Sequence, residues 1–97
     1  MDLTGKQVLV AGLGKSGIAA GALLKKMGCM VCLFDGNEKF DRSAWEKTYP
    51  VFSDCPLWIG ELPDAAVQEM ELAVVSPGIP LDTPAILKLQ AAGVPVV

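Results

Sequence analysis

Residues 8–17 of the chain read VLVAGLGKSG. The apolar run at the start of this stretch continues without interruption to Gly12, as in a strand that is buried on both faces of a parallel sheet. Gly12, Gly14 and Gly17 then form a Gly-x-Gly-x-x-Gly pattern, and a segment with helical periodicity follows. A strand, a glycine turn and a helix in this order are typical of the phosphate-binding turn of nucleotide-binding folds.

Each glycine of this turn has its own expected role. Gly12 permits the sharp turn, Gly14 lets a phosphate approach the backbone, and Gly17 lets the helix pack closely on the strand. The N–H groups of the first helical turn then point at the anion. The alternative interpretation is a tight glycine turn that binds nothing.

The sequence Gly14-Lys15-Ser16 also resembles the end of an ATP-binding P-loop. That motif requires a glycine five residues before Gly14, and Leu9 occupies this position. We therefore do not interpret the turn as a P-loop. Lys15 is expected either to meet a diphosphate as a point charge or to be solvated.

Apolar runs and amphipathic segments alternate along the whole chain. The predicted strands are 8–11, 30–34, 57–59, 72–75 and 94–97, and the predicted helices are 16–27, 43–48, 63–70 and 84–92. This alternation is typical of β/α/β units. We predict one Rossmann-like α/β domain over residues 1–97, with an open parallel sheet of about five strands and helices on both faces. Because the last strand is apolar up to the final residue, we expect the domain to be part of a longer protein.

Composition limits the possible partners of the chain. It has 97 residues, of which 52% are hydrophobic and 20% charged, and its formal net charge is −3. Such a chain lacks the positive charge that binds nucleic acid or an anionic membrane. No apolar run approaches the ~20 residues that span a bilayer, and no secretory signal pattern opens the chain, so we predict a cytoplasmic protein.

The three cysteines are not expected to form a metal or redox site. Cys29 and Cys32 fall at the start of the second predicted strand, where residues three apart point to opposite faces. Their thiols therefore diverge, and Cys55 alone cannot complete a metal site. Buried apolar cysteine is the preferred interpretation.

Two other segments end predicted strands at the same edge of the sheet as the glycine turn. Asp35 follows the second strand and is expected to bind a ribose hydroxyl or a base, or alternatively to cap the following turn. Residues 76–80 read SPGIP and follow the fourth strand. There Gly78 would let a ligand approach the backbone, and the alternative is a turn stiffened by proline. Ligands of open α/β sheets lie beyond the carboxyl ends of the strands, so we expect one shared site.

Taken together, these residues resemble the N-terminal domain of the Mur ligases, and among them the members that add D-glutamate. The resemblance covers essentially the whole chain and rests on the glycine turn, Asp35, the stretch VSPGIP at 75–80 and AGVPV at 92–96. It implies a domain that holds the UDP moiety of UDP-N-acetylmuramoyl-L-alanine for an ATP-dependent ligase of peptidoglycan synthesis. It also implies a central domain that carries ATP, Mg²⁺ and the chemical step, and a C-terminal domain that brings the amino acid, so this chain alone is expected to be inactive.

The resemblance also implies roles for individual residues. Lys15 and Ser16 would meet the diphosphate, Asp35 and its neighbours the uridine, and residues 76–78 the uracil side of the pocket. The predicted substrate site comprises Gly12, Gly14, Lys15, Ser16, Gly17, Asp35, Gly36, Ser76, Pro77 and Gly78, without catalytic or metal-binding residues. Two alternatives stay open. A regulatory module that binds NAD or NADH would use the same glycine turn, with Asp35 on the adenosine ribose, and a bare Rossmann-like scaffold would serve protein contacts.

Overall fold

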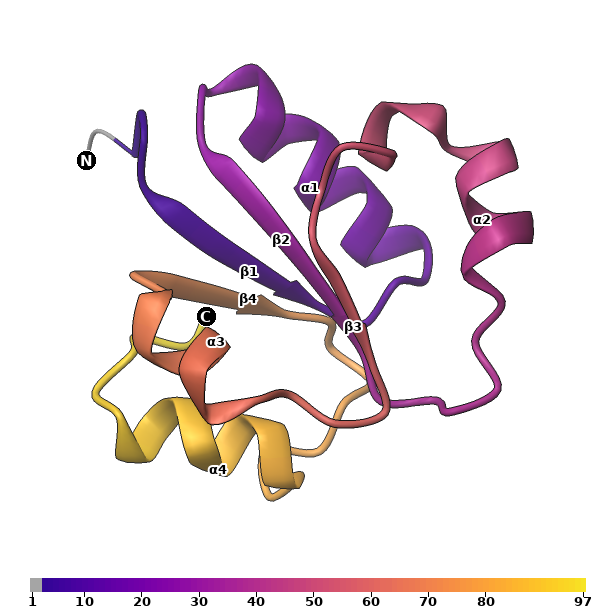
Figure 1. Cartoon of the computed structure of the whole chain (residues 1–97). Helices are drawn as coiled ribbons and strands as arrows, with labels where there is room; N and C mark the ends of the chain where they lie inside the picture. Colours follow the sequence, from indigo (N-terminus) through magenta and orange to yellow (C-terminus); the bar gives the residue numbers. More distant parts are fainter. Residues whose placement is uncertain (1–2) are drawn as a thin grey trace.

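Four parallel strands form the sheet of the computed structural model, in the order β3-β2-β1-β4 (Figure 1). The structure describes residues 3–97, so Met1 and Asp2 of the predicted domain lie outside it. The strands are β1 (Gln7–Ala11), β2 (Met30–Asp35), β3 (Leu57–Ile59) and β4 (Leu72–Val75). The helices are α1 (Lys15–Lys26), α2 (Arg42–Thr48), α3 (Asp64–Glu69) and α4 (Pro84–Ala91), with a short 3₁₀ helix η1 (Pro50–Phe52). The predicted Rossmann-like fold is confirmed, although the sequence did not predict η1.

Strand β1 lies in the middle of the sheet, where its apolar sequence requires burial on both faces. It pairs with β2 on one side and with β4 on the other, so that Val8 aligns with both Val31 and Leu72. Residues 8–11 are at most 1% exposed. This burial explains why the run contains no polar residue.

The sheet has four strands rather than about five, because residues 94–97 form only an isolated bridge with β4. Val96 pairs with Ala73, and the N–H of Ala73 donates to the carbonyl of Pro95 at 2.9 Å. The preceding bond of a parallel ladder would need an N–H from Pro95, which proline lacks. The predicted fifth strand is therefore reduced to a bridge, and the segment lies beside β4 as expected.

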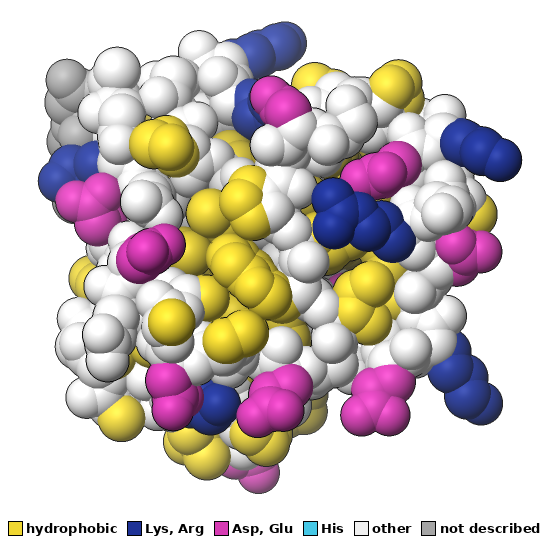
Figure 2. All heavy atoms as spheres, in the orientation of Figure 1, with side chains coloured by type: hydrophobic (Ala, Val, Ile, Leu, Met, Phe, Trp, Pro, Cys, Tyr) yellow, Lys and Arg dark blue, Asp and Glu magenta, His cyan; other side chains and the backbone are white. Residues whose placement is uncertain are grey.

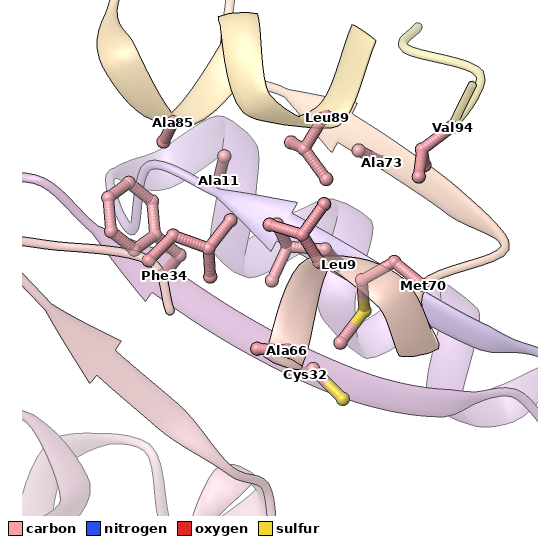
Figure 3. Close-up of a cluster of buried hydrophobic side chains, with 12 residues drawn as sticks. Leu9, Ala11, Cys32, Phe34, Ala66, Met70, Ala73, Ala85, Leu89 and Val94 are labelled. Atoms are coloured by element: carbon pink, nitrogen blue, oxygen red, sulfur yellow. The ribbon is translucent and has the colours of Figure 1, made fainter. Parts of the chain in front are cut away.

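One hydrophobic core fills the space between the sheet and the pair α3 and α4 (Figure 3). Leu9 and Ala11 of β1 point to this side, as do Cys32 and Phe34 of β2. Leu89 of α4 packs against them and is fully buried. The alternate residues of each strand thus define which face of the sheet these two helices cover.

A second core lies on the opposite face, under α1, α2 and η1. Val8 and Val10 of β1 point to this side and meet Leu24 of α1. Phe52 of η1 is 1% exposed, and its ring stacks on Trp45 of α2 with 5.3 Å between ring centroids. Helices therefore cover both faces of the sheet, as predicted.

One face of the molecule exposes a group of apolar side chains. Hydrophobic side chains gather in the middle of the face drawn in Figure 2, and acidic and basic side chains lie around them. Among the helices of the described residues, none is long and apolar enough to cross a membrane.

The three thiols lie in different surroundings, and this difference is testable. Cys32 and Cys55 are each 5% exposed and belong to opposite cores, whereas Cys29 is half-buried. Desolvation by burial raises the pKa of the Cys32 and Cys55 thiols above the ordinary value. Raised pKa values mean less thiolate at pH 8, and it is the thiolate that reacts.

We predict that the folded chain at pH 8 shows one fast and two slow thiols with an aromatic disulfide reagent. The C29S variant should lose the fast phase, and urea should make all three thiols of the original chain react quickly. Three equally fast thiols in the folded chain would contradict the burial described here.

Candidate functional site

A cavity of about 910 Å³ lies at the carboxyl edge of the sheet, beyond the ends of all four strands. Its wall comes from the β1–α1 turn, the segments after β2 and β3, the β4–α4 connection and the first turns of α4. Nine of the ten predicted site residues line it: Gly12, Gly14, Lys15, Ser16, Asp35, Gly36, Ser76, Pro77 and Gly78. The topology therefore brings together segments that lie far apart in the sequence, as the carboxyl-edge argument predicts.

The glycine turn is held from both neighbouring strands. The N–H of Gly12 donates to the carbonyl of Phe34 at 2.8 Å, on the β2 side. On the β4 side, the Ser76 hydroxyl donates to the carbonyl of Gly12 at 3.1 Å. The position of the turn is thus defined before any ligand is present.

Gly12 and Gly17 are required by the packing of the turn on itself. Gly12 has φ of +90°, in the region that favours glycine. A Cβ at Gly17 would lie 1.8 Å from the carbonyl oxygen of Gly12, which no side chain can tolerate. Gly17 is the tenth predicted site residue, and it faces the turn rather than the large cavity. Its position agrees with the close helix–strand packing expected from the motif.

Gly14 stands at the N-terminus of α1 and leaves it open. It is the N-cap residue, and no side chain caps this end of the helix. Among the bonds within residues 3–97, none uses the N–H groups of Gly14, Lys15 or Ser16. A Cβ at Gly14 would meet no atom within 4 Å. These three exposed donors, at the positive end of the helix dipole, form a cradle suited to an anion, and Lys15 adds a positive charge beside it.

Asp35 takes part in the structure of the site through both carboxylate oxygens. Its Oδ2 accepts from the N–H of Leu13 at 3.0 Å, and its Oδ1 accepts from the N–H of Asn37 at 2.9 Å. The carboxylate therefore caps the turn after β2, as the alternative interpretation predicted, and also fastens the glycine turn. An ionised carboxylate has about four acceptor positions, so it still has room for a ligand hydroxyl or N–H.

The segment after β4 is a tight turn with an open backbone. The N–H of Ser76 donates to the carbonyl of Ala11, and the N–H of Ile79 donates back to the carbonyl of Ser76. A Cβ at Gly78 would meet no atom within 4 Å. The bond between Ile79 and Ser76 closes the turn, and Gly78 leaves open the access that a ligand would need.

The cavity includes residues that the sequence analysis did not identify. Gly60, Glu61 and Leu62 follow β3, and the others belong to α4 and its N-cap: Thr83, Pro84, Ala85, Ile86 and Lys88. The carboxyl-edge rule could have indicated Gly60, because it follows a predicted strand. No sequence signal marks the part of the cavity beside α4, which is apolar and bounded by Phe34, Leu62 and Ile86, all at most 6% exposed.

Residues 6–97 match the family model described as Mur ligase MurD-like, N-terminal domain. The chain is 43% identical, over 99% of its length, to UDP-N-acetylmuramoylalanine–D-glutamate ligase of Lachnospira eligens. It is 41% identical, over its full length, to the ligase of the same name from Caldicellulosiruptor saccharolyticus. The chain spans 21% of the length of each of these relatives.

Solved structures with a similar fold include dehydrogenases. The match to shikimate dehydrogenase from Aquifex aeolicus covers 98% of this chain and 42% of the dehydrogenase chain, with a TM-score of 0.61 and 16% sequence identity. The match to D-lactate dehydrogenase from Escherichia coli covers 99% of this chain and 29% of the dehydrogenase chain, with a TM-score of 0.60 and 20% sequence identity. At these identities the likeness extends to the Rossmann-like fold alone.

The geometry of the turn predicts a large loss of folding stability for one glycine substitution and a small change for another. G17A places a methyl group against the Gly12 carbonyl and should destabilise the chain by about 3 kcal/mol or more, because a packed turn must open. G14A adds a methyl group in open space and should change the free energy of unfolding by less than about 1 kcal/mol. Urea denaturation followed by circular dichroism measures both, and equal stabilities for the two variants would contradict the close approach at Gly17.

Proposed function

The chain belongs to the family of Mur ligase MurD-like N-terminal domains, and we propose that it binds the UDP moiety of UDP-N-acetylmuramoyl-L-alanine. The observation that carries this proposal is the open N-terminus of α1, whose donors line a cavity large enough for a nucleotide. The name of the relatives, UDP-N-acetylmuramoylalanine–D-glutamate ligase, indicates that this nucleotide is UDP.

The whole protein would then be an ATP-dependent ligase that adds D-glutamate in the cytoplasm during peptidoglycan synthesis. We expect ATP and Mg²⁺ to bind in a central domain outside this chain, and D-glutamate to be brought by a C-terminal domain. Within the chain, Leu9 occupies the position where a P-loop needs its first glycine, and it is a fully buried core residue. The chain by itself would therefore bind the substrate without catalysing the ligation.

The diphosphate would lie on the cradle at the start of α1. Backbone N–H groups of Gly14, Lys15 and Ser16 would donate to its oxygens, and the ammonium of Lys15 would supply a positive charge. The net charge of the chain is −3, so attraction to a diphosphate must come from these local groups rather than from the overall field. Gly12 and Gly17 would contribute indirectly, by giving the turn its shape.

The uridine would extend from the cradle across the ends of the neighbouring strands. The Asp35 carboxylate and the backbone at Gly36 would meet it at the end of β2, and residues 76–78 would border the uracil side. The lining of the cavity is mostly apolar, which suits a planar ring. A small number of polar contacts in a mostly apolar pocket is the usual composition of a ligand site.

NAD or NADH is the second candidate ligand. Asp35 at the end of β2 is the observation that favours it, because an acid at this place binds the adenosine ribose in dinucleotide-binding folds. A bare scaffold for protein contacts would bind neither nucleotide. These functions are separated by titrating the ¹⁵N-labelled chain with UDP-N-acetylmuramoyl-L-alanine, UDP and NADH while following the backbone amide shifts.

The proposal predicts that the two uridine nucleotides shift the amide signals of residues 12–16, residues 35–36, Ser76 and Gly78, and that NADH binds more weakly. Preferential binding of NADH would favour the dinucleotide alternative. Absence of binding by any of the three would contradict both ligand-binding functions. Affinity is expected to be modest, because the missing domains would supply part of the pocket.

We predict that G14V abolishes UDP binding and leaves the fold intact. An isopropyl group at this position meets no protein atom near its Cβ and instead fills the space that the phosphate needs. The amide shifts of the free variant should match the original chain outside the turn, and UDP should no longer change them. Undiminished binding by G14V would show that the backbone cradle is not the phosphate site.

A further inference from the structure

The bond between Asp35 and Leu13 joins the end of β2 to the glycine turn. Oδ2 of Asp35 accepts from the N–H of Leu13 at 3.0 Å, and Leu13 is 5% exposed. Oδ1 accepts from the N–H of Asn37 at 2.9 Å, so both oxygens hold the carboxylate in one orientation. A backbone N–H that donates to an ionised carboxylate makes one of the stronger hydrogen bonds. Leu13 directly precedes Gly14, so this bond fixes the turn one peptide away from the anion donors.

The Ser76 hydroxyl makes the corresponding link from the end of β4. Its single hydrogen is donated to the carbonyl of Gly12 at 3.1 Å. The N–H of Ser76 donates to the carbonyl of Ala11, so the side chain projects from a fixed backbone. A Cβ at Gly12 would lie only 2.8 Å from Oγ of Ser76, so the serine packs directly on the turn. Two side chains therefore hold the consecutive residues Gly12 and Leu13 from opposite sides.

Asp35 also places a negative charge in the cavity that is proposed to bind an anion. Its residue lines the same cavity as Gly14, Lys15 and Ser16. By Coulomb's law alone, this charge weakens the binding of a diphosphate. The bond to Leu13 acts in the opposite direction, because a turn already in its binding conformation loses less freedom when an anion binds. Removing the charge therefore strengthens diphosphate binding if repulsion dominates and weakens it if the bond to Leu13 dominates.

We propose that Asp35 and Ser76 are positioning residues for the diphosphate, on which they act through the glycine turn. This inference rests on the proposed function and gives Asp35 a second role besides its contact with the uridine. Both side chains keep the turn in the conformation that presents the N–H groups of residues 14–16 to the cavity. Loss of either bond lets the turn adopt other conformations, and the apparent affinity for an anion falls with the fraction of chains whose turn is competent.

Inorganic diphosphate is the probe that separates this role from a contact with the nucleoside, because it has neither base nor ribose. D35N removes the charge and keeps the size of the side chain, but its NH₂ group then faces one of the two N–H groups that the carboxylate bonds. S76A removes the hydroxyl and leaves the charge of the chain unchanged. The two variants thus break the two links to the turn separately.

The matched controls are at α2, where neither residue lines the cavity. D41N makes the same change of charge at Asp41, whose Oδ1 accepts from the N–H of Ala44 at 3.1 Å and caps the helix. T48V removes a hydroxyl that donates to the carbonyl of Ala44 at 3.3 Å. Each control therefore loses the same kind of hydrogen bond as its partner variant.

Dissociation constants for inorganic diphosphate, measured from amide shifts at constant ionic strength, provide the first readout. D35N and S76A should each weaken diphosphate binding about fivefold or more, the amount expected for one lost hydrogen bond. D41N and T48V should leave it unchanged. Amide hydrogen exchange of the ligand-free chains provides the second readout. The amide of Leu13 should exchange faster in D35N than in the original chain, and D41N should not change it.

The possible failures are distinguishable. If UDP binds the original chain and D35N binds inorganic diphosphate equally well or better, the inference is wrong and the proposed function stands. Unchanged diphosphate affinity in S76A would overturn it too, and this variant carries the test if D35N does not fold. Unchanged exchange at Leu13 in a folded D35N would contradict the link itself. If the original chain binds neither UDP nor inorganic diphosphate, the proposed function fails and the inference fails with it.

Discussion

The close approach of Gly17 to the carbonyl of Gly12 is the contact on which the rest of this structure depends. A side chain at Gly17 would overlap that carbonyl, so only glycine allows α1 to start so near the end of β1. The same carbonyl accepts the hydroxyl of Ser76, which links the turn to the end of β4. One compact turn therefore joins the central strand, the first helix and the fourth strand.

The site is preorganised because the backbone groups that hold the glycine turn in place are not the N–H groups that are free to bind an anion. Phe34, Asp35 and Ser76 hold the turn through its first two residues, Gly12 and Leu13. The next three N–H groups, at the start of α1, take no part in these bonds. An anion that binds there would not need to displace a protein group, and the loss of conformational freedom on binding is correspondingly small.

The sequence predicted most of the fold, since apolar runs and glycines mark the ends of β1, α1 and β2 clearly. The length of the fifth strand was overestimated. The apolar pattern of 94–97 is that of a strand, but Pro95 has no N–H to donate to the ladder. The sequence also could not show that Asp35 and Ser76 are internal partners of the glycine turn. Their bonds connect residues 22 and 64 positions apart, and such pairs depend on the order of the strands.

The cavity beside α4 was less predictable than the glycine turn. Its apolar wall is assembled from β2, the β3–α3 connection and α4, none of which carries a recognisable binding motif. Lys88 reads as an ordinary basic residue in the last turn of a helix, where it would be expected to complement the helix dipole. Its Nζ donates to the Leu62 carbonyl at 3.0 Å, a contact that depends on how α3 and α4 pack on one face of the sheet.

A crystal structure of the chain with UDP would test the central claim that the open end of α1 is a diphosphate cradle. The account predicts diphosphate oxygens about 2.9 Å from the backbone nitrogens of Gly14, Lys15 and Ser16, with the uracil beside residues 76–78. A diphosphate bound elsewhere on the chain, with these three N–H groups left in solvent, would contradict it.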